Sequence, residues 1–120
     1  MINELKPNGY IVVGTNALGL HYGGAARQAY MNFGALIGQS RGCIGGQSYG
    51  IVTLDADMQK VSIEAIKKQR RELEIIARSN PDKIFYLTPI GTGIAGFTFD
   101  EIEPLFEKLP ENIIKVNWKV

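Results

Sequence analysis

The sequence predicts one α/β domain with a mostly parallel central sheet and helices on both of its faces. Short runs of β-branched and aromatic residues alternate along the chain with segments whose apolar residues recur at helical spacing. Helices that connect successive strands make those strands parallel. A chain of 120 residues is long enough to bury a core of its own, so we expect a single domain over residues 1–120.

The first half of the chain holds two predicted strands and one helix. Residues 10–13 (YIVV) form a short apolar run between turn residues, which predicts a buried strand. Residues 24–36 carry apolar residues at helical spacing, which predicts a helix that begins at paired glycines. Gly34 marks the expected end of this helix. Residues 37–47 hold four glycines and no clear period, so we expect a loop. Residues 48–54 (SYGIVTL) predict the second strand.

A long amphipathic helix and a third strand follow. Ser62 is a good N-cap for a helix over residues 63–79, because its hydroxyl can accept a hydrogen bond from the first turn. Asn80 and Pro81 end that helix. Residues 83–90 (KIFYLTPI) predict the next strand.

The last helix and strand come after a glycine-rich turn. Thr98 and Glu101 have the spacing of a capping box. Pro104 lies inside the helix that would follow, so we expect it to kink that helix or delay its start. Residues 113–118 predict the last strand.

The composition excludes several classes of function. A net charge of +1 argues against binding that depends on nucleic acid or an anionic membrane. Cys43 is the only cysteine and His21 the only histidine, which excludes an internal disulfide and any site built from several thiolates or imidazoles. No apolar run reaches membrane-spanning length, and the first residues show no cleavage-site pattern. We therefore expect a cytoplasmic protein without a metal or cofactor.

Glycine is enriched, and its positions are informative. Fourteen residues are glycine, against roughly 7% in an average protein. Residues 14–24 and 91–96 each follow a predicted strand, and ligands of open α/β sheets bind at the carboxyl ends of strands. Such loops bring backbone N–H groups close to an anion, and a helix N-terminus adds further donors. The two loops are therefore either a cradle for a diphosphate or turns that allow tight packing of helices on the sheet.

Two common nucleotide motifs do not fit these loops. Neither contains Gly-Lys-Ser/Thr, so a triphosphate site of the Walker type is not indicated. Residues 91–96 (GTGIAG) match G-x-G-x-x-G, but the strand that follows is the last one. The acidic residue of a dinucleotide fold thus has no place about 20 residues further on.

Three segments resemble those of the macrodomains, a family that binds ADP-ribose. They are residues 13–26 (VGTNALGLHYGGAA), 45–53 (GGQSYGIVT) and 89–97 (PIGTGIAGF), in the family's order, and the resemblance covers residues 10–106. It implies a short stand-alone macrodomain with a minimal three-layer α/β/α fold. The ligand-binding residues that it implies are Gly14, Thr15, Asn16, His21, Tyr22, Gly23, Gly24, Ala25, Gly91, Thr92, Gly93, Ile94, Ala95, Gly96 and Phe97.

The resemblance also implies roles for individual residues. The amide of Asn16 would bond a hydroxyl of the distal ribose, and Phe97 would lie near that ribose. The two glycine loops would approach the diphosphate from opposite sides. His21 matches a histidine found in some hydrolytic members, whereas Ala26 replaces the aspartate of another hydrolytic class. The family's adenine-contacting acidic residue lies upstream of this strand, so we expect other residues to recognise adenine here.

Three functions remain open from the sequence. The first is binding of ADP-ribose or a related nucleotide-diphosphate ribose, a small-molecule partner. The second is an ADP-ribosyl hydrolase in which Asn16 and His21 position water, acting on ADP-ribosylated proteins or small conjugates. The third is a binder that sequesters a signal nucleotide derived from ADP-ribose.

Overall fold

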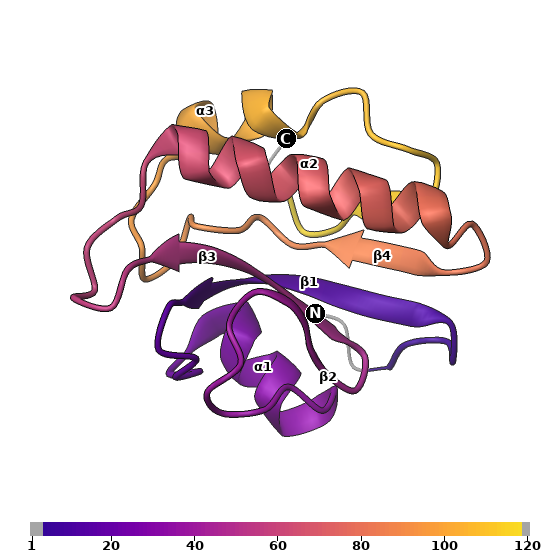
Figure 1. Ribbon diagram of the computed structural model, residues 1–120, viewed down its shortest axis with the longest axis horizontal. Coiled ribbons are helices and arrows are strands. Elements are labelled where there is room, and N and C mark those ends of the chain that lie inside the picture. Colours follow the sequence, from indigo (N-terminus) through magenta and orange to yellow (C-terminus); the bar gives the residue numbers. More distant parts are fainter. Residues whose placement is uncertain (1–3, 119–120) are drawn as a thin grey trace.

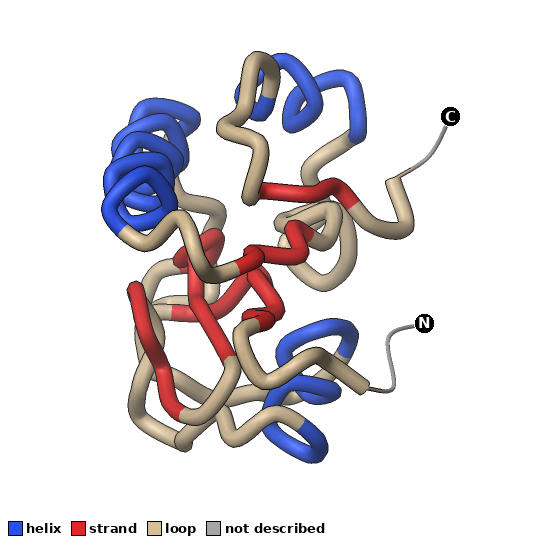
Figure 2. Tube along the Cα trace, turned by 90° about the vertical axis from the view of Figure 1, so that its right-hand side faces the viewer, coloured by secondary structure: helices blue, strands red, loops and turns tan. Residues whose placement is uncertain are grey.

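The computed structural model describes residues 4–118 and has an α/β fold, as the sequence predicts. Five strands form one sheet in the order β2-β3-β1-β4-β5, in which every neighbouring pair is parallel except β2 and β3. Figures 1 and 2 show α1 on one face of this sheet and α2 and α3 on the other. The elements are β1 (Gly9–Asn16), α1 (Gly24–Asn32), β2 (Gly42–Gly45), β3 (Ser48–Leu54), α2 (Ile63–Ser79), β4 (Ile84–Leu87), α3 (Phe99–Ile102), the 3-10 helix η1 (Glu103–Phe106) and β5 (Ile113–Lys115).

Strand β1 is the centre of the sheet and divides the core into two halves. Its side chains alternate between the two faces. Ile11 and Val13 pack with Ala29 and Phe33 on the α1 side. Val12 packs on the other side, in the larger cluster that includes Leu73 of α2. The parallel neighbours β3 and β4 place their carboxyl ends at the same edge of the sheet as Asn16.

The edge strand β2 corrects the prediction of a structureless loop over residues 37–47. It runs antiparallel to β3, with Gly42 opposite Gly50 and Cys43 opposite Tyr49. Ile44 is its one buried apolar side chain. A strand of four residues with two glycines and one apolar anchor has no detectable period, so the sequence gives no sign of it.

Helix α1 ends where Gly34 predicts its end. Its last residue is Asn32 and its C-cap is Phe33, so Gly34, with a φ of +77°, directly follows the cap. Leu36, expected on the apolar face of the helix, lies in the following loop with 57% of its surface exposed.

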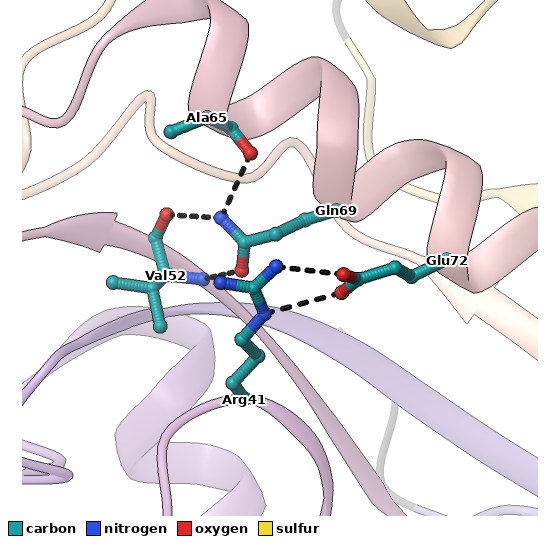
Figure 3. Close-up of polar contacts among 5 residues, drawn as sticks. All are labelled: Arg41, Val52, Ala65, Gln69 and Glu72. Carbon is teal, nitrogen blue, oxygen red and sulfur yellow. Dashed lines mark hydrogen bonds and ion pairs between the residues drawn. The ribbon is translucent and has the colours of Figure 1, made fainter.

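The helices in the second half of the chain follow their predictions closely. The Ser62 side chain accepts a hydrogen bond from the Ala65 N–H at 3.1 Å and begins α2. A bidentate ion pair between Arg41 and Glu72 joins α2 to the loop before β2 (Figure 3). Thr98 and Glu101 form the expected capping box, and Pro104 lies in the first turn of η1, which takes over from α3.

Strands β4 and β5 are shorter than their predictions. β4 covers four of residues 83–90, and β5 covers the first three of residues 113–118. Within residues 4–118 no helix is long and apolar enough to cross a membrane.

Candidate functional site

A cleft of about 220 Å³ lies at the carboxyl ends of β1, β3 and β4. The loop between β1 and α1 borders it, and so does the loop between β4 and α3. Its lining residues are Gly14, Thr15, Asn16, Leu20, Tyr22, Gly23, Gly24, Ala25, Ala26, Thr53, Leu54, Met58, Thr88, Pro89, Ile90, Gly91, Thr92, Gly93, Ile94 and Ala95.

Asn16 fixes the start of the first loop through its own side chain. Its Oδ1 accepts a hydrogen bond from the Leu20 N–H at 3.0 Å, and its Nδ2 donates to the Leu20 carbonyl. The side chain is buried at the end of β1, where the pairing with β3 shifts register. Asn16 therefore shapes the loop that carries Gly23 and Gly24, in addition to lining the cleft.

The first turn of α1 supplies backbone donors to the cleft. Gly23 is the N-cap and makes no side-chain hydrogen bond, and the first turn holds no acidic residue. Gly24 has a φ of +61°, which glycine adopts without strain. The first N–H groups of a helix have no partner within it, and the helix dipole makes this end positive. This edge of the cleft thus suits an anion.

The second loop is held in shape by hydrogen bonds within it. The Phe97 N–H donates to the Gly91 carbonyl at 2.8 Å, and the Gly96 N–H donates to the Gly93 carbonyl at 3.0 Å. The Thr92 hydroxyl donates to the Pro89 carbonyl at 2.7 Å. Gly91 has a φ of +77°, so the turn requires glycine there.

The two loops approach each other closely because glycines lie between them. A Cβ atom added to Gly23 would lie 3.4 Å from Cδ1 of Ile94. One added to Gly14 would lie 3.1 Å from the Gly91 nitrogen. A side chain at Gly14 would crowd the second loop, so the close approach of that loop to β1 favours glycine at this position.

The polar side chains in the cleft use their donors within the protein. The hydroxyl of Thr15 donates to the Ser40 carbonyl, that of Thr53 to the Thr15 carbonyl, and that of Thr88 to the Val12 carbonyl. Among the described lining residues no side chain is charged. The donors left for a ligand are the backbone N–H groups of the two loops and the hydroxyl of Tyr22, which is 60% exposed.

His21 lies outside the cleft lining, against the prediction that it and Asn16 share the site. Its side chain is buried, with Nε2 2.9 Å from the Leu36 carbonyl oxygen and the ring 6.2 Å from that of Tyr30. Its Nδ1 is buried without a hydrogen-bond partner among the described residues. The structure therefore places the imidazole between the first loop and the loop after α1.

Gly96 and Phe97 are also absent from the lining, whereas the twelve other predicted site residues line the cleft. Phe97 is buried in the core beneath the second loop, and the Lys60 ammonium lies 4.9 Å from the centre of its ring. The Phe97 side chain therefore anchors the second loop to the core.

Part of the lining lies outside the residues predicted from the sequence. Thr53 and Leu54 end β3 beside β1, and Thr88 and Pro89 follow β4. The rule that ligands bind at the carboxyl ends of parallel strands could have found these residues. Met58, in the turn after β3, carries no sequence signal for the site. Residues 4–118 hold no group of three or more potential metal ligands.

Comparisons with known proteins place this geometry in a known fold. No family model and no curated protein matches the sequence. The macrodomain of DarG from Mycobacterium tuberculosis is similar in structure, with a TM-score of 0.63 and 16% identity over 91% of this chain and 88% of that one. A protein of unknown function from Bacteroides thetaiotaomicron has a TM-score of 0.52 and 14% identity over 90% of this chain and 88% of its own. The chain therefore has a macrodomain-like fold.

Proposed function

We propose that this protein binds ADP-ribose or a related nucleotide-diphosphate ribose between its two glycine-rich loops. The observation that carries the proposal is the cleft itself. Two loops rich in backbone donors face each other across the carboxyl ends of three parallel strands, and the first loop leads directly into helix α1. The likeness to a macrodomain supports the ligand class.

In this proposal the diphosphate is bound by backbone N–H groups. Donors come from the first turn of α1 at residues 24–26 and from Gly91, Gly93, Ile94 and Ala95 of the second loop, whereas the Thr92 N–H donates to the Pro89 carbonyl. Both loops lack a charged side chain, so the positive end of the helix dipole and the aligned N–H groups supply the attraction. The Thr53 and Thr88 hydroxyls already donate their protons, so their free lone pairs can accept hydrogen bonds from ribose hydroxyls.

The placements of three residues favour binding over hydrolysis. A hydrolase needs a group that activates or positions water. His21 is buried against the Leu36 carbonyl, outside the lining. The Asn16 amide is paired with Leu20, and Ala26 occupies the position of the aspartate in one hydrolytic class. A ligand on this site is therefore retained, as a free signal nucleotide or as the modification on an ADP-ribosylated protein.

Isothermal titration calorimetry with ADP-ribose, AMP and ribose 5-phosphate tests the proposal. We expect ADP-ribose to bind at micromolar concentration and the two fragments to bind at least tenfold more weakly, because each carries only one phosphate. Absence of heat from all three at millimolar concentration would refute the proposal. Release of ADP-ribose from a modified protein by the wild type would instead favour the hydrolase.

A matched pair of variants tests the role of the second loop. Gly93 is exposed, and a Cβ added to it meets no atom within 4 Å, so the protein accommodates a side chain there. Gly93→Glu brings a negative charge to the proposed diphosphate site, and Gly93→Gln brings the same shape without the charge. We expect Gly93→Glu to weaken ADP-ribose binding at least tenfold and Gly93→Gln to stay within threefold of wild type. Equal affinities for the two variants would place the diphosphate elsewhere.

A further inference from the structure

We infer that the cleft recognises the ribose-diphosphate part of its ligand and accepts different bases on the other ribose. This inference rests on the proposed function and widens its ligand class from ADP-ribose to nucleoside-diphosphate riboses that differ in the base. It follows from the size of the cleft and from the hydrogen bonds that its side chains already make.

The cleft is too small to enclose a whole nucleoside-diphosphate ribose. Pockets that bury most of a drug-sized ligand have volumes of roughly 300–1,000 Å³, and this one has about 220 Å³. A diphosphate with one ribose is the part of the ligand that matches the donors of both loops. The second ribose and its base then extend to the open side of the cleft, where the lining residue Tyr22 is 60% exposed.

Side chains that read the edge of a base are missing from the described lining. A side chain reads the edge of adenine by bonding its amino group and a ring nitrogen together, as the amide of Asn or Gln does in DNA. Asn16 is the one amide side chain in the lining that residues 4–118 form, and both ends of that side chain bond Leu20. No carboxylate, imidazole, guanidinium or ammonium group lines the cleft in residues 4–118.

The remaining contacts are ones that do not depend on the base. Backbone N–H groups bind phosphate oxygens, and the threonine hydroxyls offer lone pairs to ribose. Tyr22 supplies the one aromatic ring among the described lining residues, and that ring is largely exposed. Stacking of a base on an aromatic ring tolerates any base, because every base has a π-face.

Calorimetry with three ligands that differ only in the base tests the inference. ADP-ribose, its hypoxanthine analogue IDP-ribose and CDP-ribose carry the same ribose-diphosphate part. Hypoxanthine has a carbonyl in place of the adenine amino group and a proton on N1. Its hydrogen-bond donor and acceptor on this edge are therefore exchanged relative to those that an adenine-reading site would bond. We expect the three dissociation constants to agree within fivefold. A loss of more than fivefold for either analogue would overturn base-independent recognition and leave the proposed function standing.

A second comparison separates the two halves of the ligand. Ribose 5-diphosphate lacks the nucleoside, and AMP lacks the distal ribose and one phosphate. We expect ribose 5-diphosphate to bind within tenfold of ADP-ribose, and AMP to bind at least tenfold more weakly than ribose 5-diphosphate. Tighter binding of AMP would overturn the inference, because recognition would then lie at the nucleoside. Failure of every ligand, ADP-ribose included, would instead defeat the proposed function.

The Gly93→Glu variant provides a control for the site of binding. If all three nucleoside-diphosphate riboses occupy one cleft through their diphosphates, the added charge weakens each by the same factor. We expect the three factors to agree within threefold. Weakening of ADP-ribose alone would show that the analogues bind elsewhere, and the inference would fail.

Discussion

Gln69 of α2 bonds both backbone groups of Val52 in β3. Its Oε1 accepts a hydrogen bond from the Val52 N–H at 2.6 Å, and its Nε2 donates to the Val52 carbonyl at 2.9 Å (Figure 3). The pairing of β3 with β2 extends only from Ser48 to Gly50, so Val52 lies beyond the end of its neighbour. The buried amide of Gln69 thus takes the place of a strand at this edge.

Replacing Gln69 with leucine should destabilise the fold. Gln69→Leu keeps the approximate size of the side chain and leaves a donor and an acceptor of Val52 without partners. Each unsatisfied buried group costs about 1–3 kcal/mol, so we expect the free energy of unfolding in urea to fall by about 2–6 kcal/mol. Lys68→Leu is the control, because Lys68 is exposed on the same helix and should change stability by less than about 0.5 kcal/mol. Equal effects of the two substitutions would show that water satisfies Val52.

The elements that the sequence predicts best are those with a strong local signal. Helix α2 has its predicted bounds because a stripe of apolar residues follows a serine cap over 17 residues. Strand β3 agrees for a similar reason, since its seven residues are apolar or small and end at a turn. Strand β2 lacks such a signal and depends on its neighbour, because only Ile44 anchors it. Tertiary pairing, which the local sequence does not encode, makes it a strand.

The same distinction applies to the candidate site, where some features have a local sequence signal and others depend on the folded structure. Glycines mark both loops, and their place after strands predicts that they meet. The direction of a side chain within a loop depends on the path of the backbone, which glycines leave free. For that reason the sequence could not show that His21 faces the Leu36 carbonyl or that Phe97 faces the core. The two hydrogen bonds between the Asn16 side chain and the Leu20 backbone likewise form only once the loop is folded.

Two glycines of the second loop should respond differently to alanine. Gly91 has a φ of +77°, and its added Cβ would lie 3.0 Å from Cδ2 of Phe97. Gly93 has open space around the same atom and no positive φ. We expect Gly91→Ala to lower the free energy of unfolding by about 1–2 kcal/mol, the cost of a left-handed residue with a side chain, and to weaken ADP-ribose binding. Gly93→Ala should stay within about 0.5 kcal/mol and bind as the wild type does, in urea titrations and calorimetry. A Gly91→Ala variant with unchanged free energy of unfolding would mean that the loop readily adopts another backbone conformation.

Tyr49 should make the fold sensitive to alkaline pH. Burial, with a smaller contribution from Glu72, raises the pKa of the Tyr49 hydroxyl to about 12. In the unfolded chain the pKa is about 10, so between pH 10 and 12 the native state retains a proton that the unfolded state loses. The Tyr49 hydroxyl makes its full contribution to the free energy of unfolding below pH 10. That contribution falls as pH rises from 10 to 12, by up to about 1.4 kcal/mol per pH unit.

The Tyr49→Phe variant isolates this effect. Urea unfolding at pH 9 and pH 11 should show a loss of stability about 1 kcal/mol larger in the wild type than in Tyr49→Phe. Other groups titrate in both proteins and cancel in the difference. Tyr30→Phe, which changes an exposed ring, should follow the wild type. Parallel profiles for wild type and Tyr49→Phe would show that the hydroxyl ionises in the native state as easily as in the unfolded chain.

His21 and Tyr22 are neighbours in the chain, and their substitutions should affect different properties. His21→Ala removes the hydrogen bond to the Leu36 carbonyl and empties a buried position, so we expect the free energy of unfolding to fall by about 1–3 kcal/mol. The dissociation constant for ADP-ribose, measured where the variant is folded, should stay within threefold of wild type. Tyr22→Ala removes an exposed ring that lines the cleft. Its stability should stay within about 0.5 kcal/mol, and ADP-ribose should bind at least fivefold more weakly. A His21→Ala variant of unchanged stability that no longer binds ADP-ribose would place the imidazole at the ligand, as the sequence first suggested.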